Sequence, residues 1–222
     1  MSVYRLDDEL FDFPSPEEAD VEYDGLLVVG GDYNPERLLR AYSNGIFPWP
    51  VAEGRAITWL SPDPRFVLKA ADFRIPKSLK KTLKKGLFDY RVNTAFAEVI
   101  HECSIVPRPG QDGTWITDDL EKGYCELNSL GFAHSFEAWQ GDKLVGGFYG
   151  VAIGPCFFGE SMFARVSDAS KCTFAHFARI MFEKGLPWID CQVHTDHLAR
   201  FGAKEIPRAE YLLMLRDALK TY

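Results

Sequence analysis

Residues 134–153 read HSFEAWQGDKLVGGFYGVAI, and this stretch sets the expected fold of the second half of the chain. Two segments rich in aromatic and β-branched residues, 134–139 and 143–153, lie on either side of Gly141-Asp142. A glycine and an aspartate between two such segments are typical of a tight β-hairpin turn. The sequence therefore predicts two antiparallel strands, from His134 to Trp139 and from Lys143 to Ile153.

The chain after this hairpin is expected to alternate between strands and helices. We expect strands at 156–158 and 187–193, and helices from Ser167 to Gly185, at 195–201 and at 208–220. A hairpin followed by helix, strand and helix is the order of α+β domains whose mixed sheet opens to admit an acyl donor. Several unrelated folds share this order, so the order alone does not decide among them.

The first half of the chain divides near residue 65. Residues 65–69 and 89–92 are predicted strands with a basic helix between them, and further helices are expected at 93–104 and after Thr117, closed by Gly131. Upstream, Asn34 and Pro35 begin a helix that ends at Asn44-Gly45, and 46–50 is expected to be a stiff loop with exposed rings. We expect an aromatic-rich N-terminal domain at 1–64 and a second domain at 65–222.

Composition places the chain among globular proteins. Hydrophobic residues make up 46% of its 222 residues, and no run of roughly 18 apolar residues is present to span a bilayer. The N-terminus leads into acidic residues rather than into an apolar signal sequence. The five cysteines are scattered without CxxC pairs, which is typical of reduced thiols. We therefore expect a soluble, cytoplasmic protein that is not exported.

The net charge of −7 argues against extensive contact with nucleic acid, but the charge is unevenly distributed. Between Arg74 and Arg91 the only acidic residue is Asp89. Four basic side chains of the helix in this region form what we call the lysine ridge: Lys80, Lys81, Lys84 and Lys85. The ridge is either a solvated helical face or a short surface that binds phosphate groups.

Three familiar catalytic or binding motifs are incomplete in this sequence. The glycines at 146–150 lack the GxGxxG spacing and fall inside a predicted strand, which argues against a phosphate-binding loop. The run Gly159–Phe163 ends in Phe where a nucleophile elbow requires Gly, which argues against a serine hydrolase. Asp190, His194 and His197 have spacing that could bind a metal, yet they match no known metal motif. We expect no metal and no cofactor.

A pair of polar residues stands out in the predicted strand at 187–193. Asp190 and Gln192 are two positions apart, so both would face the same side of the sheet. The carboxylate could orient the carboxamide, whose carbonyl oxygen could then accept a hydrogen bond from an incoming amine. A purely structural hydrogen-bonded pair is the alternative, because buried polar groups are normally paired.

Six runs of residues together resemble one protein family. They are 24–32 (DGLLVVGGD), 45–49 (GIFPW), 59–65 (WLSPDPR), 113–116 (GTWI), 159–163 (GESMF) and 189–192 (IDCQ). In this order they resemble the bacterial leucyl/phenylalanyl-tRNA–protein transferases, over a match from about Phe13 to Leu215. Each run is longer than a generic motif, so agreement of all six by chance is improbable.

The resemblance implies a small N-terminal domain packed on a mixed-sheet domain like those of GNAT acetyltransferases. It implies transfer of Leu or Phe from aminoacyl-tRNA to the N-terminal Arg or Lys of an acceptor protein, which marks that protein for degradation in an N-degron pathway. An apolar pocket discriminates by only about 1 to 3 kcal/mol per methylene, so Met could also be accepted as a donor. The resemblance assigns Asp190, Gln192 and Glu160 to catalysis. Seven further positions match substrate-binding residues of the family: Trp49, Trp115, Tyr42, Tyr124, Phe157, Met162 and Ile189.

Within this resemblance, the lysine ridge is expected to bind tRNA and the protein is expected to be a monomer. Two other classes of function share some of these features. An acyl-CoA-dependent N-acetyltransferase would share the fold but would need a pyrophosphate-binding loop before a helix. A non-catalytic tRNA-binding module would need the lysine ridge without the Asp190 and Gln192 pair.

Overall fold

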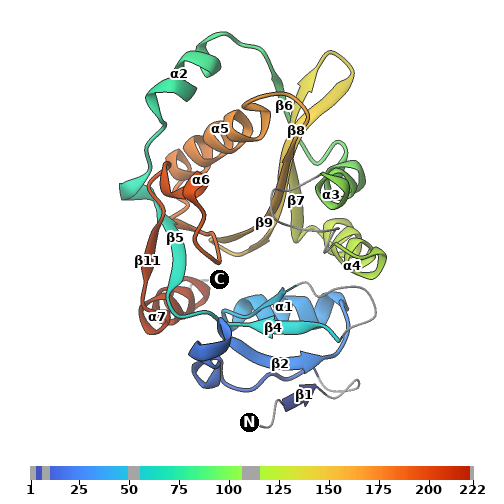
Figure 1. Cartoon of the computed structure of the whole chain (residues 1–222), viewed down its shortest axis with the longest axis vertical. Coiled ribbons are helices and arrows are strands. Elements are labelled where there is room, and N and C mark those ends of the chain that lie inside the picture. Colours follow the sequence, from blue (N-terminus) through green and yellow to red (C-terminus); the bar gives the residue numbers. More distant parts are fainter. Residues whose placement is uncertain (1–3, 7–10, 50–55, 107–115, 221–222) are drawn as a thin grey trace.

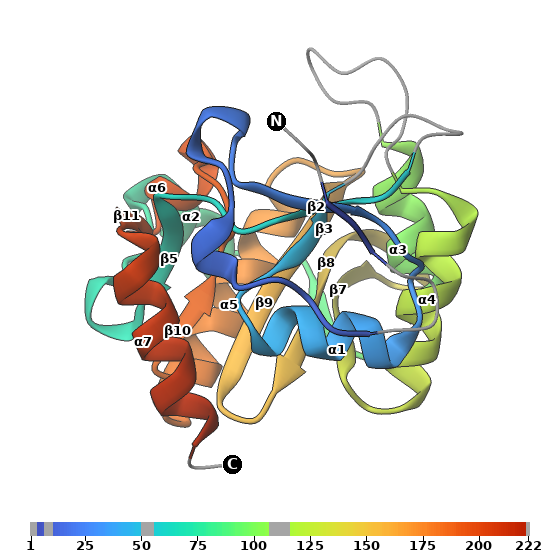
Figure 2. The ribbon, with the colours of Figure 1, turned by 90° about the horizontal axis from the view of Figure 1, so that it is seen from below.

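The computed structural model describes residues 4–6, 11–49, 56–106 and 116–220, which form two β-sheets with helices around them (Figure 1). The smaller sheet has the strand order β1-β2-β4-β3 and the larger has the order β11-β5-β10-β9-β8-β7-β6. The smaller sheet and its helix lie at one end of the larger sheet (Figure 1 and Figure 2). The described chain is therefore a mixed α+β protein with a small N-terminal unit, as the sequence predicted.

The N-terminal unit consists of short strands, one helix and two 3-10 turns. Its elements are β1 (Tyr4–Leu6), η1 (Pro16–Glu18), η2 (Val21–Tyr23), β2 (Leu26–Gly30), α1 (Pro35–Ser43), β3 (Phe47–Trp49) and β4 (Thr58–Leu60). The side chain of Asn34 accepts a hydrogen bond from the backbone of Glu36, which caps α1 as expected. The helix ends at Asn44, and Gly45 follows with a φ of +75°. This left-handed backbone conformation favours glycine, and a Cβ at Gly45 would also lie 2.6 Å from the Leu212 side chain, which would have to shift.

The larger sheet is built around three long antiparallel strands. Its strands are β5 (Arg65–Lys69), β6 (Asp89–Val92), β7 (Ala133–Gln140), β8 (Lys143–Ile153), β9 (Cys156–Ala164), β10 (Trp188–Asp190) and β11 (Lys204–Ile206). β7 and β8 form the predicted hairpin around Gly141-Asp142. β10 runs parallel to β9 and antiparallel to β5, so the sheet is mixed. Glu160 on β9 and Asp190 at the end of β10 therefore lie on neighbouring strands.

Helices cover both faces of the larger sheet. They are η3 (Ala70–Asp72), α2 (Lys77–Lys84), α3 (Phe96–Ile105), α4 (Asp118–Ser129), α5 (Ala169–Glu183), α6 (Asp196–Ala199) and α7 (Arg208–Leu219). One apolar cluster joins α5 to side chains such as Phe136, Phe148 and Phe157. A second cluster joins α3, α4 and α7 to the N-terminal unit through residues such as Tyr42 and Trp59. The N-terminal unit therefore shares its core with the larger sheet.

The N-terminus of α3 is held by a carboxylate from the sheet. Its N-cap residue, Ala95, has no side chain that can cap the helix. Glu137 on β7 takes this role, because its buried carboxylate accepts hydrogen bonds from the backbone amides of Thr94 and Ala95, both at 2.9 Å. The hydroxyl of Thr94 donates a further bond to the same group, as do Trp139 and Ser135. Burial alone would raise the pKa of Glu137, but these donors outweigh burial and lower it.

The structure corrects several sequence-based expectations. β10 ends at Asp190 rather than at residue 193, because the chain turns at Gln192, where φ is +62°. Asp168, not Ser167, occupies the N-cap position of α5. The segment expected to be a loop with exposed rings contains a short strand, β3, in which Phe47 is buried. No helix within the described ranges is long and apolar enough to cross a membrane.

Candidate active site

Two polar clusters, one buried and one partly buried, meet where β9, β10 and the N-terminal unit come together. One is centred on Asp190 and the other on Glu160, and Gln192 contacts both. The residues around them come from β5, α1, α4 and α7, which are far apart in the sequence. The fold thus assembles this site from both parts of the chain.

Asp190 is completely enclosed and fully hydrogen bonded. Arg65 donates to its two oxygens, from Nε to Oδ1 at 2.9 Å and from a terminal nitrogen to Oδ2 at 2.6 Å. The hydroxyl of Tyr211 donates to Oδ2 at 2.7 Å, and the backbone amide of Gln192 donates to Oδ1 at 2.9 Å. A carboxylate has about four lone-pair positions, so these donors use its whole capacity.

Arg65 is held as firmly as the carboxylate that it binds. Its guanidinium lies between the rings of Phe47 and Tyr211, at 4.6 and 4.5 Å from their centroids. It also donates to the carbonyl of Gly45 at 3.2 Å. Burial would lower the pKa of Arg65, but the adjacent Asp190 carboxylate raises it above its usual value. Arg65 therefore stays charged and links the N-terminal unit to the site.

Glu160 has a different surrounding. The hydroxyl of Tyr42 donates to its Oε1 at 2.7 Å, and the hydroxyl of Tyr124 donates to Oε2 at 3.1 Å. The carboxamide nitrogen of Gln192 donates to Oε1 at 2.6 Å. Among the residues that the structure describes, these three bonds leave about one lone-pair position, on Oε2, unused. Unlike Asp190, Glu160 can therefore accept a further hydrogen bond or a proton.

Burial raises the pKa of Glu160 to about 7, although the hydrogen bonds from Tyr42, Tyr124 and Gln192 oppose this change. The number of hydrogens available for the hydrogen bonds around Glu160 also favours a raised pKa. The two tyrosine hydroxyls also contact each other, so three oxygen contacts link Tyr42, Tyr124 and Glu160. Burial and the neighbouring carboxylate raise the pKa of both tyrosines, so each supplies only one hydrogen. A proton on Glu160 supplies the third hydrogen, which stabilises the protonated form.

Gln192 connects the two carboxylates through different atoms. Its backbone amide binds Asp190, whereas its side-chain nitrogen binds Glu160. The sequence had suggested that the two side chains share one face of the strand, where the Asp190 carboxylate would contact the carboxamide of Gln192 directly. This direct contact is wrong, because the strand ends at Asp190 and the carboxylate binds the backbone amide of Gln192 instead. Glu160 orients the carboxamide instead. No donor among the described residues is bonded to its carbonyl oxygen.

The other predicted site residues lie in several places. Phe157 and Ile189 are paired across β9 and β10 in the apolar cluster beneath α5, and Met162 packs against this cluster. Trp49 is 38% exposed and contacts the ring of Phe47 edge-on. Trp115 lies outside the described residues. The lysine ridge is exposed on α2, at the opposite end of the molecule from the N-terminal unit (Figure 1).

The sequence interpretation did not identify Arg65 and Tyr211 as site residues. Arg65 stood in one of the family-like runs, and a charged residue at the start of the apolar strand 65–69 was the available signal. Tyr211 lies on a helix that carries no such signal. The suggested metal ligands do not come together, because His194 packs against Phe66 and Asp190 is fully bonded. Within the described ranges no group of three or more His, Cys, Asp or Glu side chains could hold a metal ion.

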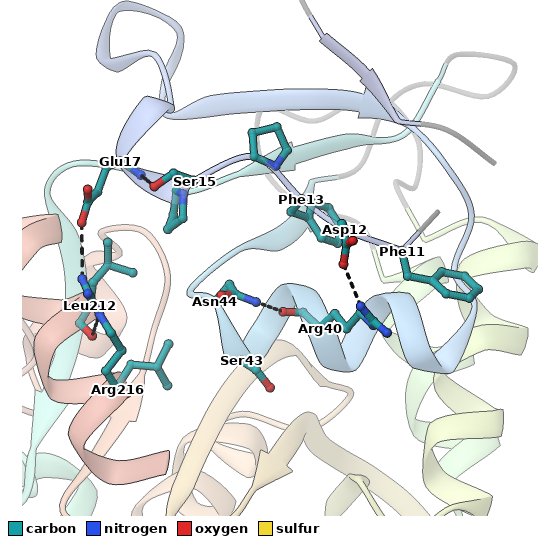
Figure 3. A pocket seen from close by; sticks show the side chains of 13 residues that line it. Phe11, Asp12, Phe13, Ser15, Glu17, Arg40, Ser43, Asn44, Leu212 and Arg216 are labelled. Carbon is teal, nitrogen blue, oxygen red and sulfur yellow. Dashed lines mark hydrogen bonds and ion pairs between the residues drawn. The ribbon is translucent and has the colours of Figure 1, made fainter. Parts of the chain in front are cut away.

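A separate cavity of about 510 Å³ lies between residues 11–17, α1 and α7 (Figure 3). Arg40 and Ser43 of α1 line it together with Asn44, which follows the helix, whereas Tyr42 on α1 contacts Glu160. Its charged side chains are paired, Arg40 with Asp12 at 2.7 Å and Arg216 with Glu17 at 3.3 Å. The charges of the four charged side chains that the structure describes in this lining are therefore compensated by one another.

Comparison with known proteins agrees with this arrangement of two units. Residues 67–216 match the family model of the leucyl/phenylalanyl-tRNA protein transferase, and residues 31–63 match the model of its N-terminal domain. The chain is 53% identical over 220 residues to the leucyl/phenylalanyl-tRNA–protein transferase of Anaeromyxobacter sp. (strain K), covering 99% of this chain and 93% of the relative. It is 52% identical over 221 residues to the one from Myxococcus xanthus, with the same coverage.

Among solved structures, a conserved protein of unknown function from Staphylococcus epidermidis is similar at a TM-score of 0.44 and 12% identity. It covers 82% of this chain and 68% of that protein. Similarity at this level does not assign the larger sheet to a fold family, so its likeness to GNAT domains stays a prediction. The sequence matches are decisive by comparison, because they extend over nearly the whole chain. The chain belongs to the leucyl/phenylalanyl-tRNA–protein transferase family.

Proposed function

We propose that this protein transfers a leucyl or phenylalanyl group from tRNA to the N-terminal amine of an acceptor protein, and that Glu160 and Gln192 act at the reacting amine. Family membership supports the overall reaction. The observation that supports these two roles is the free acceptor capacity of both side chains. Glu160 retains about one unused lone-pair position, and the carbonyl oxygen of Gln192 has no donor within the described chain.

The reaction requires placement and the movement of one proton. The ester bond that joins an amino acid to tRNA is already activated, and an N-terminal amine has a pKa of about 8, so part of it is neutral near pH 7. As the amine attacks the ester carbonyl, the new C–N bond forms and the C–O bond to the ribose breaks. The amine loses one proton and the ribose oxygen gains one.

In this proposal the Gln192 carbonyl oxygen accepts a hydrogen bond from the attacking amine and directs it. Glu160 takes the proton and returns it to the leaving ribose oxygen. A general base works best when its pKa is close to the operating pH, and burial raises the pKa of Glu160 to about 7. Asp190 has no lone pair left to take this proton, so it contributes through the backbone of Gln192.

Several substrate contacts remain part of the same proposal. Trp49 and Trp115 would stack on the terminal adenosine, while Phe157, Met162 and Ile189 would surround the donor side chain. Tyr42 and Tyr124 would fix Glu160, and the lysine ridge would bind the tRNA backbone. The net charge of −7 favours acceptors that begin with Arg or Lys, including N-degron substrates.

Three broader points also remain proposals: the protein acts as a monomer, it acts in the cytoplasm, and its domains divide at residues 1–64 and 65–222. The position of the division is supported by the strands, because β4 ends at Leu60 and β5 begins at Arg65.

The reaction is tested with labelled Leu-tRNA and a peptide that begins with Arg. We expect labelled peptide with the parent protein, and much less with an otherwise identical peptide that begins with Glu. Glu160→Gln and Gln192→Ala should each reduce transfer at least about tenfold, which corresponds to about 1.4 kcal/mol of barrier. Glu102→Gln is the matched control, because Glu102 forms an ion pair with Arg165. No transfer by the parent would refute the activity, whereas unchanged transfer by Glu160→Gln would remove Glu160 from the proton path.

A further inference from the structure

We infer that Arg65, supported by Tyr211, is a positioning residue for the reaction: it fixes the Asp190 carboxylate, which in turn holds the backbone of Gln192 in the conformation that presents its carboxamide. This inference rests on the proposed role of Gln192. Arg65 lies on β5, 127 positions before Gln192 in the chain.

The first step of the argument concerns Asp190. Its carboxylate is 0% exposed, and within the described ranges all of its hydrogen bonds go to Arg65, Tyr211 and the amide of Gln192. A carboxylate whose lone pairs are all used cannot accept a proton from substrate without losing one of these partners. Its influence on the reaction therefore passes through the groups that it binds, and of these only Gln192 also contacts Glu160.

The second step concerns the backbone of Gln192. Its φ of +62° is a left-handed conformation that costs a residue with a side chain about 1 kcal/mol or more. The next residue, Val193, donates to the carbonyl of Cys191 at 2.8 Å, which closes a tight turn around Gln192. Such a conformation persists only where the surroundings hold it. The carboxamide leaves the backbone from this turn, so its direction depends on the turn.

The third step identifies what holds the turn. The amide of Gln192 donates to Asp190, and the carbonyl of Gln192 accepts from the backbone amide of Phe66 at 3.1 Å. Phe66 follows Arg65 directly in β5. The carbonyl of Gln192 is therefore bonded to the start of β5, and its amide is bonded to the carboxylate that pairs with Arg65. The Arg65 guanidinium binds the Asp190 carboxylate in a bidentate manner, because both carboxylate oxygens accept a hydrogen bond from it, and this fixes the orientation of the carboxylate.

Lysine cannot reproduce this arrangement. Its ammonium carries the same charge but is a point donor on a flexible stem, and it lacks the planar fork that binds two oxygens. It would also lose the stacking between the rings of Phe47 and Tyr211. Arg65→Lys therefore keeps the positive charge beside Asp190, but the Asp190 carboxylate is no longer held in one orientation.

Arg208 provides a matched control. It is also a buried arginine that links parts of the molecule, because it donates to the carbonyl of Ser61 at 2.7 Å and to that of Ala19 at 3.1 Å. It has no contact with Asp190, Glu160 or Gln192. Arg208→Lys should therefore lower the melting temperature without changing the turnover of the folded enzyme.

The experiment measures stability, kcat and the KM for Leu-tRNA in the full-length chain. We expect Arg65→Lys to lower kcat at least about tenfold while the KM for Leu-tRNA changes less than about twofold. Tyr211→Phe removes one donor to Asp190 and keeps the ring, so a smaller fall in kcat is expected. In a Gln192→Ala background, Arg65→Lys should cause little further loss, because both changes act on the same group.

A spectroscopic measurement separates this inference from the proposed reaction. The backbone amide of Gln192, observed by NMR, should shift in Arg65→Lys and stay unchanged in Arg208→Lys, whether or not the parent transfers amino acids. An unchanged Gln192 amide in Arg65→Lys would overturn the inference. The inference would also be overturned if Arg208→Lys, at the same loss of stability, lowered kcat as much as Arg65→Lys. It would equally be overturned if the effects of Arg65→Lys and Gln192→Ala on kcat multiplied in the double variant.

Discussion

Replacement of Glu160 by glutamine should stabilise the protein at alkaline pH. In the parent, three oxygen–oxygen contacts join Tyr42, Tyr124 and Glu160 to one another. When Glu160 is ionised, only the two tyrosine hydroxyls supply hydrogens, so one of the three contacts has no hydrogen. A glutamine amide can donate to Tyr124 while its oxygen accepts from Tyr42, and Tyr124 can then donate to Tyr42. Every contact would have a hydrogen at all pH values. Glutamine therefore imitates the protonated carboxyl group.

The magnitude follows from the difference between the ordinary pKa of 4.5 and the raised pKa of about 7 in the folded protein. Each pKa unit corresponds to about 1.4 kcal/mol, so ionisation of Glu160 costs the folded state up to about 3 kcal/mol. Because the folded pKa is raised, the stabilising effect of the proton is fully present below pH 4.5 and is lost as the pH rises through about 7. The parent should lose this stability between these values, and Glu160→Gln should keep it.

Urea unfolding of the parent and of Glu160→Gln, measured at pH values from about 5 to 8.5, tests this reasoning. We expect Glu160→Gln to be more stable by about 3 kcal/mol at the upper end and nearly equal to the parent at the lower end. Glu102→Gln is the control variant, because Glu102 is a partly buried carboxylate that pairs with Arg165 rather than with tyrosine hydroxyls. A stability difference between the parent and Glu160→Gln that stays constant across this range would refute the raised pKa.

Three other changes have defined outcomes. Alanine at all four positions of the lysine ridge should weaken tRNA binding and reduce the slope of log affinity against log salt by about 1 per lost phosphate contact, measured by filter binding at several salt concentrations. Trp49→Ala should weaken calorimetric binding of an aminoacyl-adenosine analogue by about 1 to 3 kcal/mol, and Trp49→Phe should recover part, whereas loss of the lysine ridge should have little effect on this small ligand. Glu137→Ala should lower the unfolding free energy by about 3 kcal/mol, seen in urea titration, because it leaves the amides of Thr94 and Ala95 without partners.

The features that could be predicted from the sequence are those that depend on neighbouring residues. The hairpin turn at Gly141-Asp142 and the helix cap at Asn34 were predicted because their residue types favour one local backbone conformation. β5 and β6 were placed correctly for the same reason. Such signals need only a few adjacent positions.

The connections within the site could not be predicted in this way. Arg65 and Asp190 are 125 positions apart, and Tyr42 and Glu160 are 118 positions apart. Their pairing depends on how the sheets pack, which no short pattern encodes. The end of β10 was also misplaced, because the left-handed turn at Gln192 is imposed by Asp190 and Phe66 rather than by the preferences of glutamine. The family resemblance supplied the residue roles, but not the atoms through which these residues act.

The sharing of one core by the N-terminal unit and the larger sheet limits how this protein can be dissected. Tyr42 binds Glu160, and the carbonyl of Gly45 binds Arg65, so each carboxylate cluster draws one of its groups from the first 49 residues. A fragment that begins at residue 65 would expose the apolar surface that Trp59 and Tyr42 now cover. It would also leave both clusters incomplete. Attempts to transplant the larger sheet into a fusion protein as an independent transfer module should therefore include α1 and β3.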